Sequence, residues 1–204
     1  MKVQVPPLIK RNTALFALSQ SFTGAGMQFT YGFGPLMVLS LTGSAGLAGL
    51  SVALIGVSRF AVAYPMGKIT DAYGRKPGIY LGLVLAMVGT LVLGSAMLVR
   101  SIEMFVGGLL MFGMGMNGAQ QMRVAATDMF PPHMRAQALG YVALGSVAGL
   151  VMSPLLVKIA SVVAPAHGLD PLGLPWFFLP VLIASGMILI SFVRPDPKTI
   201  GMNL

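Results

Sequence analysis

The chain has 204 residues, of which 56% are hydrophobic and only 9% are charged, and its mean hydropathy is +0.85. A soluble domain is about a quarter charged, so this composition excludes a well-solvated surface and predicts an integral membrane protein in a lipid bilayer. The net charge of +8 is typical of cytoplasmic loops rather than of nucleic-acid binding, and we expect no nucleic-acid partner. The absence of cysteine excludes disulfides, thiolate metal sites and cysteine nucleophiles.

Six apolar segments follow one another along the chain, each close to or above the ~20 residues that a membrane-spanning helix needs. They cover residues 12–41, 45–66, 77–98, 103–127, 137–160 and 174–193. The first is too long for a signal-peptide core, and we expect it to be a retained helix. Within it, Gly32, Gly34 and Pro35 predict a kink or the end of its regular part. The sequence therefore predicts an all-α membrane protein, a six-transmembrane-helix bundle.

The positive charges alternate between the connections of these segments. They gather in the N-terminal tail, in the second and fourth connections and in the C-terminal tail, as Lys2, Lys10, Arg11, Lys68, Arg75, Lys76, Arg135, Arg194 and Lys198. The first connection has none, and Arg100 in the third is offset by Glu103. The positive-inside rule then predicts that both termini and the even-numbered loops face the cytoplasm. The fifth connection, residues 164–175, is expected outside as a partly ordered, proline-rich cap.

The second connection, GKITDAYGRK at residues 67–76, holds more charged residues, of both signs, than a loop needs to set the orientation of the helices in the membrane. A plain basic loop that anchors orientation is the simpler interpretation. However, the pattern resembles the signature loop of the major facilitator superfamily, roughly G-x-L-A-D-x-x-G-R-R/K, which in that family lies between the second and third helices. Five positions match this pattern in spacing and location: Gly67, Asp71, Gly74, Arg75 and Lys76. Asp71 and Arg75 are also four residues apart, a spacing at which acid and base can meet.

Two further stretches resemble the same family. Asp128, followed by Phe-Pro-Pro and then Arg135, is similar to its connection between helices four and five, and residues 194–198 are similar to the start of its central linker. The resemblance implies a six-helix domain over residues 1–193 and the start of a linker or cytoplasmic tail over 194–204. Because members of this family usually have about twelve helices in two six-helix halves, the chain resembles the N-terminal half.

The resemblance also implies a role for the charged connection. In the family, the acid and the first arginine of this loop hold the cytoplasmic side closed in the outward-open state. They form a charge network with an acid near the end of helix four and contact a helix of the other half. The expected conformational gate therefore comprises Gly67, Asp71, Gly74, Arg75, Lys76 and Asp128. The basic residue that drug/proton antiporters carry early in helix four is absent. The fifth helix carries Gly145, Gly149 and Ser153-Pro154, a small-residue face suited to close packing.

Polar residues inside the predicted spans are candidates for a substrate cavity, because ionisable groups are costly in the membrane. Arg59 and Arg123 either reach back to the cytoplasmic interface or line a water-filled cavity that holds an anionic solute. The polar residues of helices one and four either line the same cavity or hold the bundle together by hydrogen bonds. The candidate cavity residues are Gln28, Tyr31, Arg59, Asn117, Gln120, Gln121 and Arg123.

These features predict facilitated or secondary-active transport of a small polar or anionic solute by alternating access, with this chain as half of a twelve-helix transporter. The alternative is a non-transporting scaffold or assembly factor with the same fold. The second half is a separate chain, a C-terminal region or another copy, and we favour a different sequence. No enzyme constellation, cofactor site or phosphate-binding loop is present, and no acid lies deep in a span to couple protons. We expect a bacterial cytoplasmic membrane.

Overall fold

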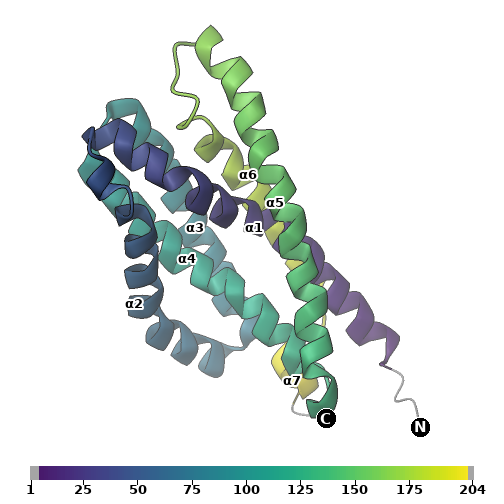
Figure 1. The fold of residues 1–204 in the computed structure, drawn as a ribbon. Coiled ribbons are helices and arrows are strands. Elements are labelled where there is room, and N and C mark those ends of the chain that lie inside the picture. Colours follow the sequence, from purple (N-terminus) through teal and green to yellow (C-terminus); the bar gives the residue numbers. More distant parts are fainter. Residues whose placement is uncertain (1–4, 202–204) are drawn as a thin grey trace.

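The protein is described by a computed structural model over residues 5–201, and these residues form helices joined by short connections (Figure 1). The long helices are α1 (Pro7–Thr42), α2 (Leu50–Tyr73), α3 (Arg75–Val99), α4 (Ile102–Asp128), α5 (Arg135–Ala166) and α6 (Pro175–Ser191). Two 3₁₀ turns, Ala45–Leu47 and Pro132–Met134, precede α2 and α5, and a short helix α7 (Pro197–Gly201) follows α6. The predicted all-α, six-helix architecture is confirmed.

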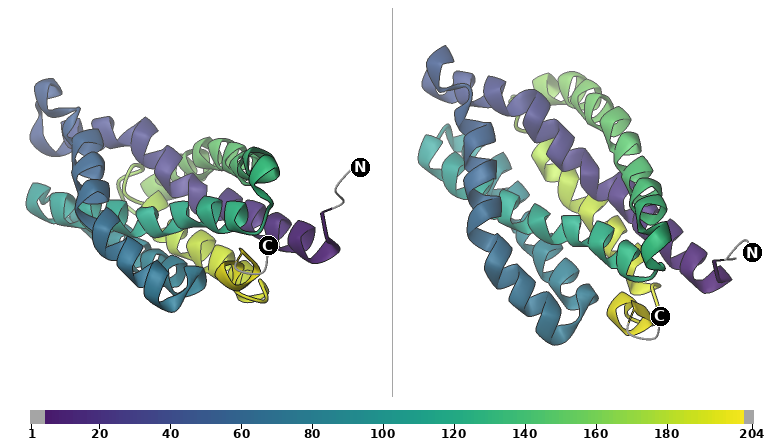
Figure 2. Two further views of the ribbon diagram at one scale, coloured as in Figure 1. Left: turned by 90° about the horizontal axis from the view of Figure 1, so that it is seen from below. Right: turned by 60° about the horizontal axis from the view of Figure 1, so that its bottom comes forward.

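The helices run up and down, so that alternate connections lie at the same end of the bundle. α3 packs along α4 and α1 along α5, while α6 contacts both α1 and α3. α2 and α5 lie on opposite sides of the bundle (Figures 1 and 2). The start of α1 meets the end of α6, because Arg11 donates to the carbonyl of Phe192 at 3.4 Å and Asn12 donates to that of Arg194 at 3.3 Å. The α2–α3 turn, the α4–α5 connection and both described chain ends therefore share one end.

Four of the described helices, α2 to α5, are each long and apolar enough to cross a membrane. α6 is apolar but has 17 residues, and α1 has 36 residues with more polar groups. α2 and α5 bury the smallest share of their apolar stretch inside the bundle and present large side chains outward, such as Phe60, which is 87% exposed. Such outward apolar surface suits lipid or another apolar protein face.

Glycines set the closest helix contacts. A Cβ atom added to Gly118 on α4 would lie 2.6 Å from the Cα atom of Gly82 on α3, so these two backbones touch. On α5, a Cβ atom at Gly149 would lie 3.0 Å from the amide of Ala25 on α1, and one at Gly145 would overlap the carbonyl of Ala17. The close packing predicted for the small-residue face of the fifth helix is therefore confirmed.

An aromatic cluster joins three helices in the half of the bundle that lies away from the chain ends. Trp176, at the start of α6, is fully buried and meets Phe29 of α1 and Phe112 of α4 edge-on, with ring centroids 5.2 and 5.5 Å apart. Phe29 also stacks on Phe33 at 5.1 Å. Edge-on aromatic pairs add stabilisation beyond their buried area, so this cluster fixes α1, α4 and α6 relative to one another.

The helix boundaries differ from the predicted segments in three places. α1 continues through Pro35 to Thr42, so the alternative in which it ends at Gly32–Pro35 is wrong. α2 continues through Gly67 and Asp71 to Tyr73, although these residues were expected in a loop. The apolar run ends before Gly67, but the charged residues after it still form the backbone hydrogen bonds of the helix. α5 extends to Ala166, which shortens the fifth connection to residues 167–174.

We expect substitution of Gly118 by valine to destabilise the bundle, because the added side chain would separate α3 from α4. Overpacking of this kind costs about 1–3 kcal/mol and should lower the melting temperature of the detergent-solubilised protein by several degrees. Gly107, on the same helix, is exposed and has no atom within 4 Å of its Cβ position, so Gly107→Val is the matched control. Equal melting temperatures for the two variants would contradict close α3–α4 packing.

Candidate functional site

A single residue connects α2 to α3. The amide of Gly74 donates to the carbonyl of Thr70 at 3.1 Å and ends α2, and Arg75 begins α3. Gly74 has φ +99°, a conformation that side chains other than glycine rarely adopt. A Cβ atom at this position would also lie 3.0 Å from Oδ2 of Asp196. The Gly74 position therefore requires glycine on both conformational and steric grounds.

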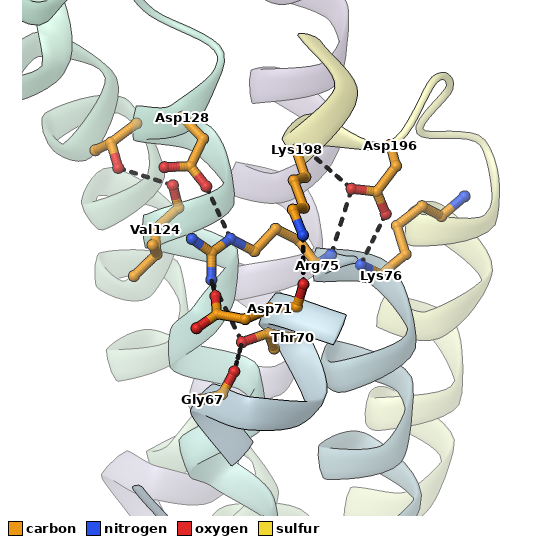
Figure 3. Close-up of polar contacts among 10 residues, drawn as sticks. Gly67, Thr70, Asp71, Arg75, Lys76, Val124, Asp128, Asp196 and Lys198 are labelled. Atoms are coloured by element: carbon orange, nitrogen blue, oxygen red, sulfur yellow. Dashed lines mark hydrogen bonds and ion pairs between the residues drawn. The ribbon is translucent and has the colours of Figure 1, made fainter. Parts of the chain in front are cut away.

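Arg75 links the ends of α2 and α4 (Figure 3). Its Nε atom donates to Oδ2 of Asp128 at 2.8 Å, whereas its NH1 atom lies 3.8 Å from Oδ1 of Asp71. Arg75 and Asp128 have side chains only 18% and 27% exposed, while that of Asp71 is 77% exposed. The structure thus brings the three predicted charged residues together and makes Asp128 the principal partner, because a short, partly desolvated pair is stronger than an exposed one.

Asp196, which follows α6, is a member of this cluster that the sequence did not identify. Its carboxylate accepts hydrogen bonds from the backbone amides of Arg75 at 3.3 Å and Lys76 at 3.1 Å, the first two residues of α3 (Figure 3). It also accepts from the amide of Lys198 at 2.9 Å in the first turn of α7. A carboxylate at a helix N-terminus satisfies orphan amides and complements the helix dipole. The Asp-Pro pattern indicates the cap on α7, but nothing local indicates the contact with α3.

Two lysines connect residues 193–198, which follow α6, to the turn between α2 and α3 by hydrogen bonds. Lys76 donates through Nζ to the carbonyl of Val193 at 2.7 Å, and Lys198 donates through Nζ to the carbonyl of Asp71. Gly67 lies within α2 with open space at its Cβ position and contributes its carbonyl, which accepts from the hydroxyl of Thr70 at 2.9 Å. The backbones of residues 71–76 and 193–198 are therefore held together by side chains from both segments.

A second candidate site lies between α1 and α5. Gln28, Tyr31, Gly32 and Phe33 line an open groove of about 380 Å³ together with residues of α5, namely Leu150, Ser153 and Pro154. We call this the α1–α5 groove. Arg59 of α2 donates to the hydroxyl of Tyr31 at 3.2 Å. Three of the predicted cavity residues, Gln28, Tyr31 and Arg59, are thus brought together.

Arg59 lies deeper than the sequence indicated. Because α2 continues to Tyr73, Arg59 is 14 residues, or about 21 Å at 1.5 Å per residue, from the end of the helix. An arginine side chain is far too short to bring its guanidinium group back to that end. Its guanidinium group instead donates to the hydroxyl of Tyr31, a residue that lines the α1–α5 groove.

The predicted cavity residues of α4 lie elsewhere. Arg123 donates to the hydroxyl of Ser146 on α5 at 2.8 Å, while its Nε atom is buried without a partner in the described residues. Asn117, Gln120 and Gln121 are partly buried on α4 and are not among the residues that line the α1–α5 groove. The polar residues therefore form two groups, one around Tyr31 and one on α4. Residues 5–201 contain no cluster of three or more metal-ligating side chains.

Comparison with known proteins identifies the family of the chain. The Major Facilitator Superfamily profile matches residues 16–202. Two similar curated proteins are the MFS-type transporters YddS and YdeG of Bacillus subtilis, 30% and 28% identical over 93% and 97% of this chain. A third, the riboflavin transporter RfnT of Brucella anthropi, is 24% identical over 94% of this chain. The chain spans 44%, 46% and 48% of these three relatives, about half of their length.

The fold has a counterpart among solved structures. An auto-inhibited POT family peptide transporter superposes with a TM-score of 0.66 and 16% identity, over 93% of this chain and 37% of that protein. At this identity the likeness concerns the fold alone. Together with the profile match over most of the chain and the helical bundle, these relatives show that the chain is an integral membrane protein of the Major Facilitator Superfamily of transporters.

Proposed function

We propose that the chain forms the N-terminal half of a twelve-helix transporter, which moves a small polar or anionic solute by alternating access. The observation that carries the proposal is the partly buried bridge from Arg75 to Asp128 and Asp71. It joins the ends of α2, α3 and α4 at one end of the bundle, where it can favour one of two global states. The positive-inside rule puts this end in the cytoplasm.

In the state described here, the bridge holds the α2–α3 turn against α4. A conformational change that separates α2 from α4 has to break the short Arg75–Asp128 hydrogen bond and expose both charges to water. Gly67, Gly74 and Lys76 have supporting roles as backbone elements and linker contacts of the same gate. We assign the substrate cavity to Gln28, Tyr31 and Arg59. The α4 residues Asn117, Gln120, Gln121 and Arg123 form a separate polar group outside the α1–α5 groove, and we propose that they meet the solute on another part of its path.

The second half is supplied by six further helices, as a separate chain, a C-terminal continuation or a second copy. The relatives, about twice as long, favour a second half of different sequence. Residues 194–204 then begin the linker, and the contacts of Asp196 and Lys198 tie that linker to the gate. The bacterial relatives support a cytoplasmic membrane as the location.

Neutralising Asp128 should open the gate more often than neutralising Asp71, because Asp128 is closer to Arg75 and less exposed. The chain has no native cysteine, so a Gly32→Cys reporter in the α1–α5 groove can be labelled with an impermeant maleimide from the gate side. Gly32 has open space at its Cβ position. We expect Asp128→Asn to raise the labelling rate about three- to tenfold, the effect of losing roughly 1 kcal/mol from the closed state.

The control is Glu103→Gln, which removes an acid from the other end of the same helix and should leave the rate unchanged. Labelling of Asp128→Asn at the unmodified rate, or a larger effect from Asp71→Asn, would contradict the gate as assigned.

Removing the carboxylate of Asp196 should free the start of α3. The amides of Arg75 and Lys76 would lose their acceptor, so hydrogen exchange at these two amides should accelerate about tenfold or more in Asp196→Ala. Exchange at Met104, whose amide is capped by the side chain of Ser101 in α4, should not change. Unaltered exchange at residues 75 and 76 would show that Asp196 does not hold the linker on the gate.

A further inference from the structure

The α1–α5 groove is flanked by prolines on both of its helices. Pro35 lies inside α1 and Pro154 inside α5. A proline has no N–H to donate to the carbonyl four residues earlier, and these carbonyls belong to Tyr31 and Leu150. Both of these residues line the groove, as does Pro154 itself. Each wall of the groove therefore carries a backbone acceptor that has lost its helical donor.

The surroundings leave this backbone accessible. Gly32 follows Tyr31, lines the groove and has no atom within 4 Å of its Cβ position. Ser153 adds a hydroxyl and Gln28 an amide to the same lining. Backbone carbonyls that a proline deprives of their helical donor are tolerated at membrane depth where they face a water-filled cavity or a polar ligand. A group with several N–H donors would satisfy both walls at once.

Arg59 supplies a positive charge that can bind the anionic end of a ligand. Both ion pairs found in residues 5–201 involve Arg75, at the gate end of the bundle, so Arg59 has no acidic partner within those residues. A guanidinium group in the middle of a membrane helix needs a counter-charge. Its hydrogen bond to Tyr31 places it where it can share an anionic group with the tyrosine hydroxyl.

The remaining surface of the groove is apolar, formed by Phe33, Pro154 and the side chain of Leu150. Phe33 stacks on Phe29, which in turn meets Trp176, so this wall is rigid. A flat or branched hydrocarbon group fits such a wall better than a fully hydrated solute.

We propose that the α1–α5 groove binds a zwitterionic amino-carboxylate with an apolar body. The ammonium group lies between the carbonyls of Tyr31 and Leu150 and the hydroxyl of Ser153. The carboxylate lies against Arg59 and the hydroxyl of Tyr31, and the hydrocarbon group lies on Phe33. This inference rests on the proposed function in that it takes the groove as the substrate cavity and names the class of substrate.

Three probes that share a phenyl group and a two-carbon chain separate the two ends of the ligand. L-Phenylalanine has both charges, 3-phenylpropionate lacks the ammonium and phenethylamine lacks the carboxylate. We would measure binding of tritiated L-phenylalanine to the 204-residue chain in nanodiscs by equilibrium dialysis, with the other two compounds as competitors. Charged hydrogen bonds at each end should make L-phenylalanine bind about 10- to 100-fold more tightly than either competitor.

Two substitutions assign the ends to residues. Arg59→Gln should bring L-phenylalanine down to the affinity of phenethylamine. Pro154→Ala restores an N–H for the Leu150 carbonyl and should reduce the preference over 3-phenylpropionate about three- to tenfold. Pro165→Ala, in the same helix but outside the groove, is the control and should retain the full preference. Fluorescence of Trp176, the single tryptophan of the chain, reports whether each variant is folded.

Competition by 3-phenylpropionate equal to that of L-phenylalanine would overturn the ammonium site. Equal competition by phenethylamine would overturn the carboxylate site at Arg59. Absence of binding by all three compounds would overturn the whole proposal. Binding requires neither a second half nor flux, so the two proposals fail separately. Binding without flux in the reconstituted assembly would contradict transport and support the zwitterion site. Flux of another solute without L-phenylalanine binding would do the reverse.

Discussion

Inside a bilayer, every backbone N–H and carbonyl has to be satisfied by the protein itself, since no water is available. This constraint accounts for the all-helical architecture, and it also restricts where polarity can occur. The helices approach one another through glycines, as at Gly82 and Gly118. In the bilayer, van der Waals packing of backbones takes the place that the hydrophobic effect has in the association of helices in water. Charges are confined to the ends of the bundle and to a few positions, such as Arg59 and Arg123, that have polar neighbours.

The gate and the groove use this constraint in opposite ways. At the proposed gate, Asp196 accepts from the backbone amides of Arg75 and Lys76, and Asp128 accepts from Nε of Arg75. In the groove, Pro35 and Pro154 supply no N–H to the carbonyls of Tyr31 and Leu150, and Arg59 has no acidic partner within residues 5–201. The two sites therefore differ in how many of their hydrogen-bonding groups have a partner within the described part of the bundle.

Sequence reasoning identified the helices and the charged turn well because both depend on local patterns. Apolar runs located all six helices. The spacing of Asp71 and Arg75, together with the family resemblance that added Asp128, anticipated a cluster that the structure brings together. The boundaries were less accurate, because residues 67–73 are polar by composition and helical by hydrogen bonding. Asp196 was missed because its contact with α3 joins residues about 120 positions apart. The separation of the α4 polar residues from Tyr31 likewise depends on helix rotation, which the sequence does not encode locally.

The turn at Gly74 has a mechanical consequence. Consecutive Cα atoms are 3.8 Å apart across a trans peptide, so one residue leaves no slack between the end of α2 and the start of α3. A displacement of either helix has to be transmitted to the other, and Arg75 and Asp196 extend the linkage to α4 and to the chain beyond α6. Opening this end of the bundle is therefore a collective movement of several helix ends, and its energy barrier should respond to substitutions on any of them.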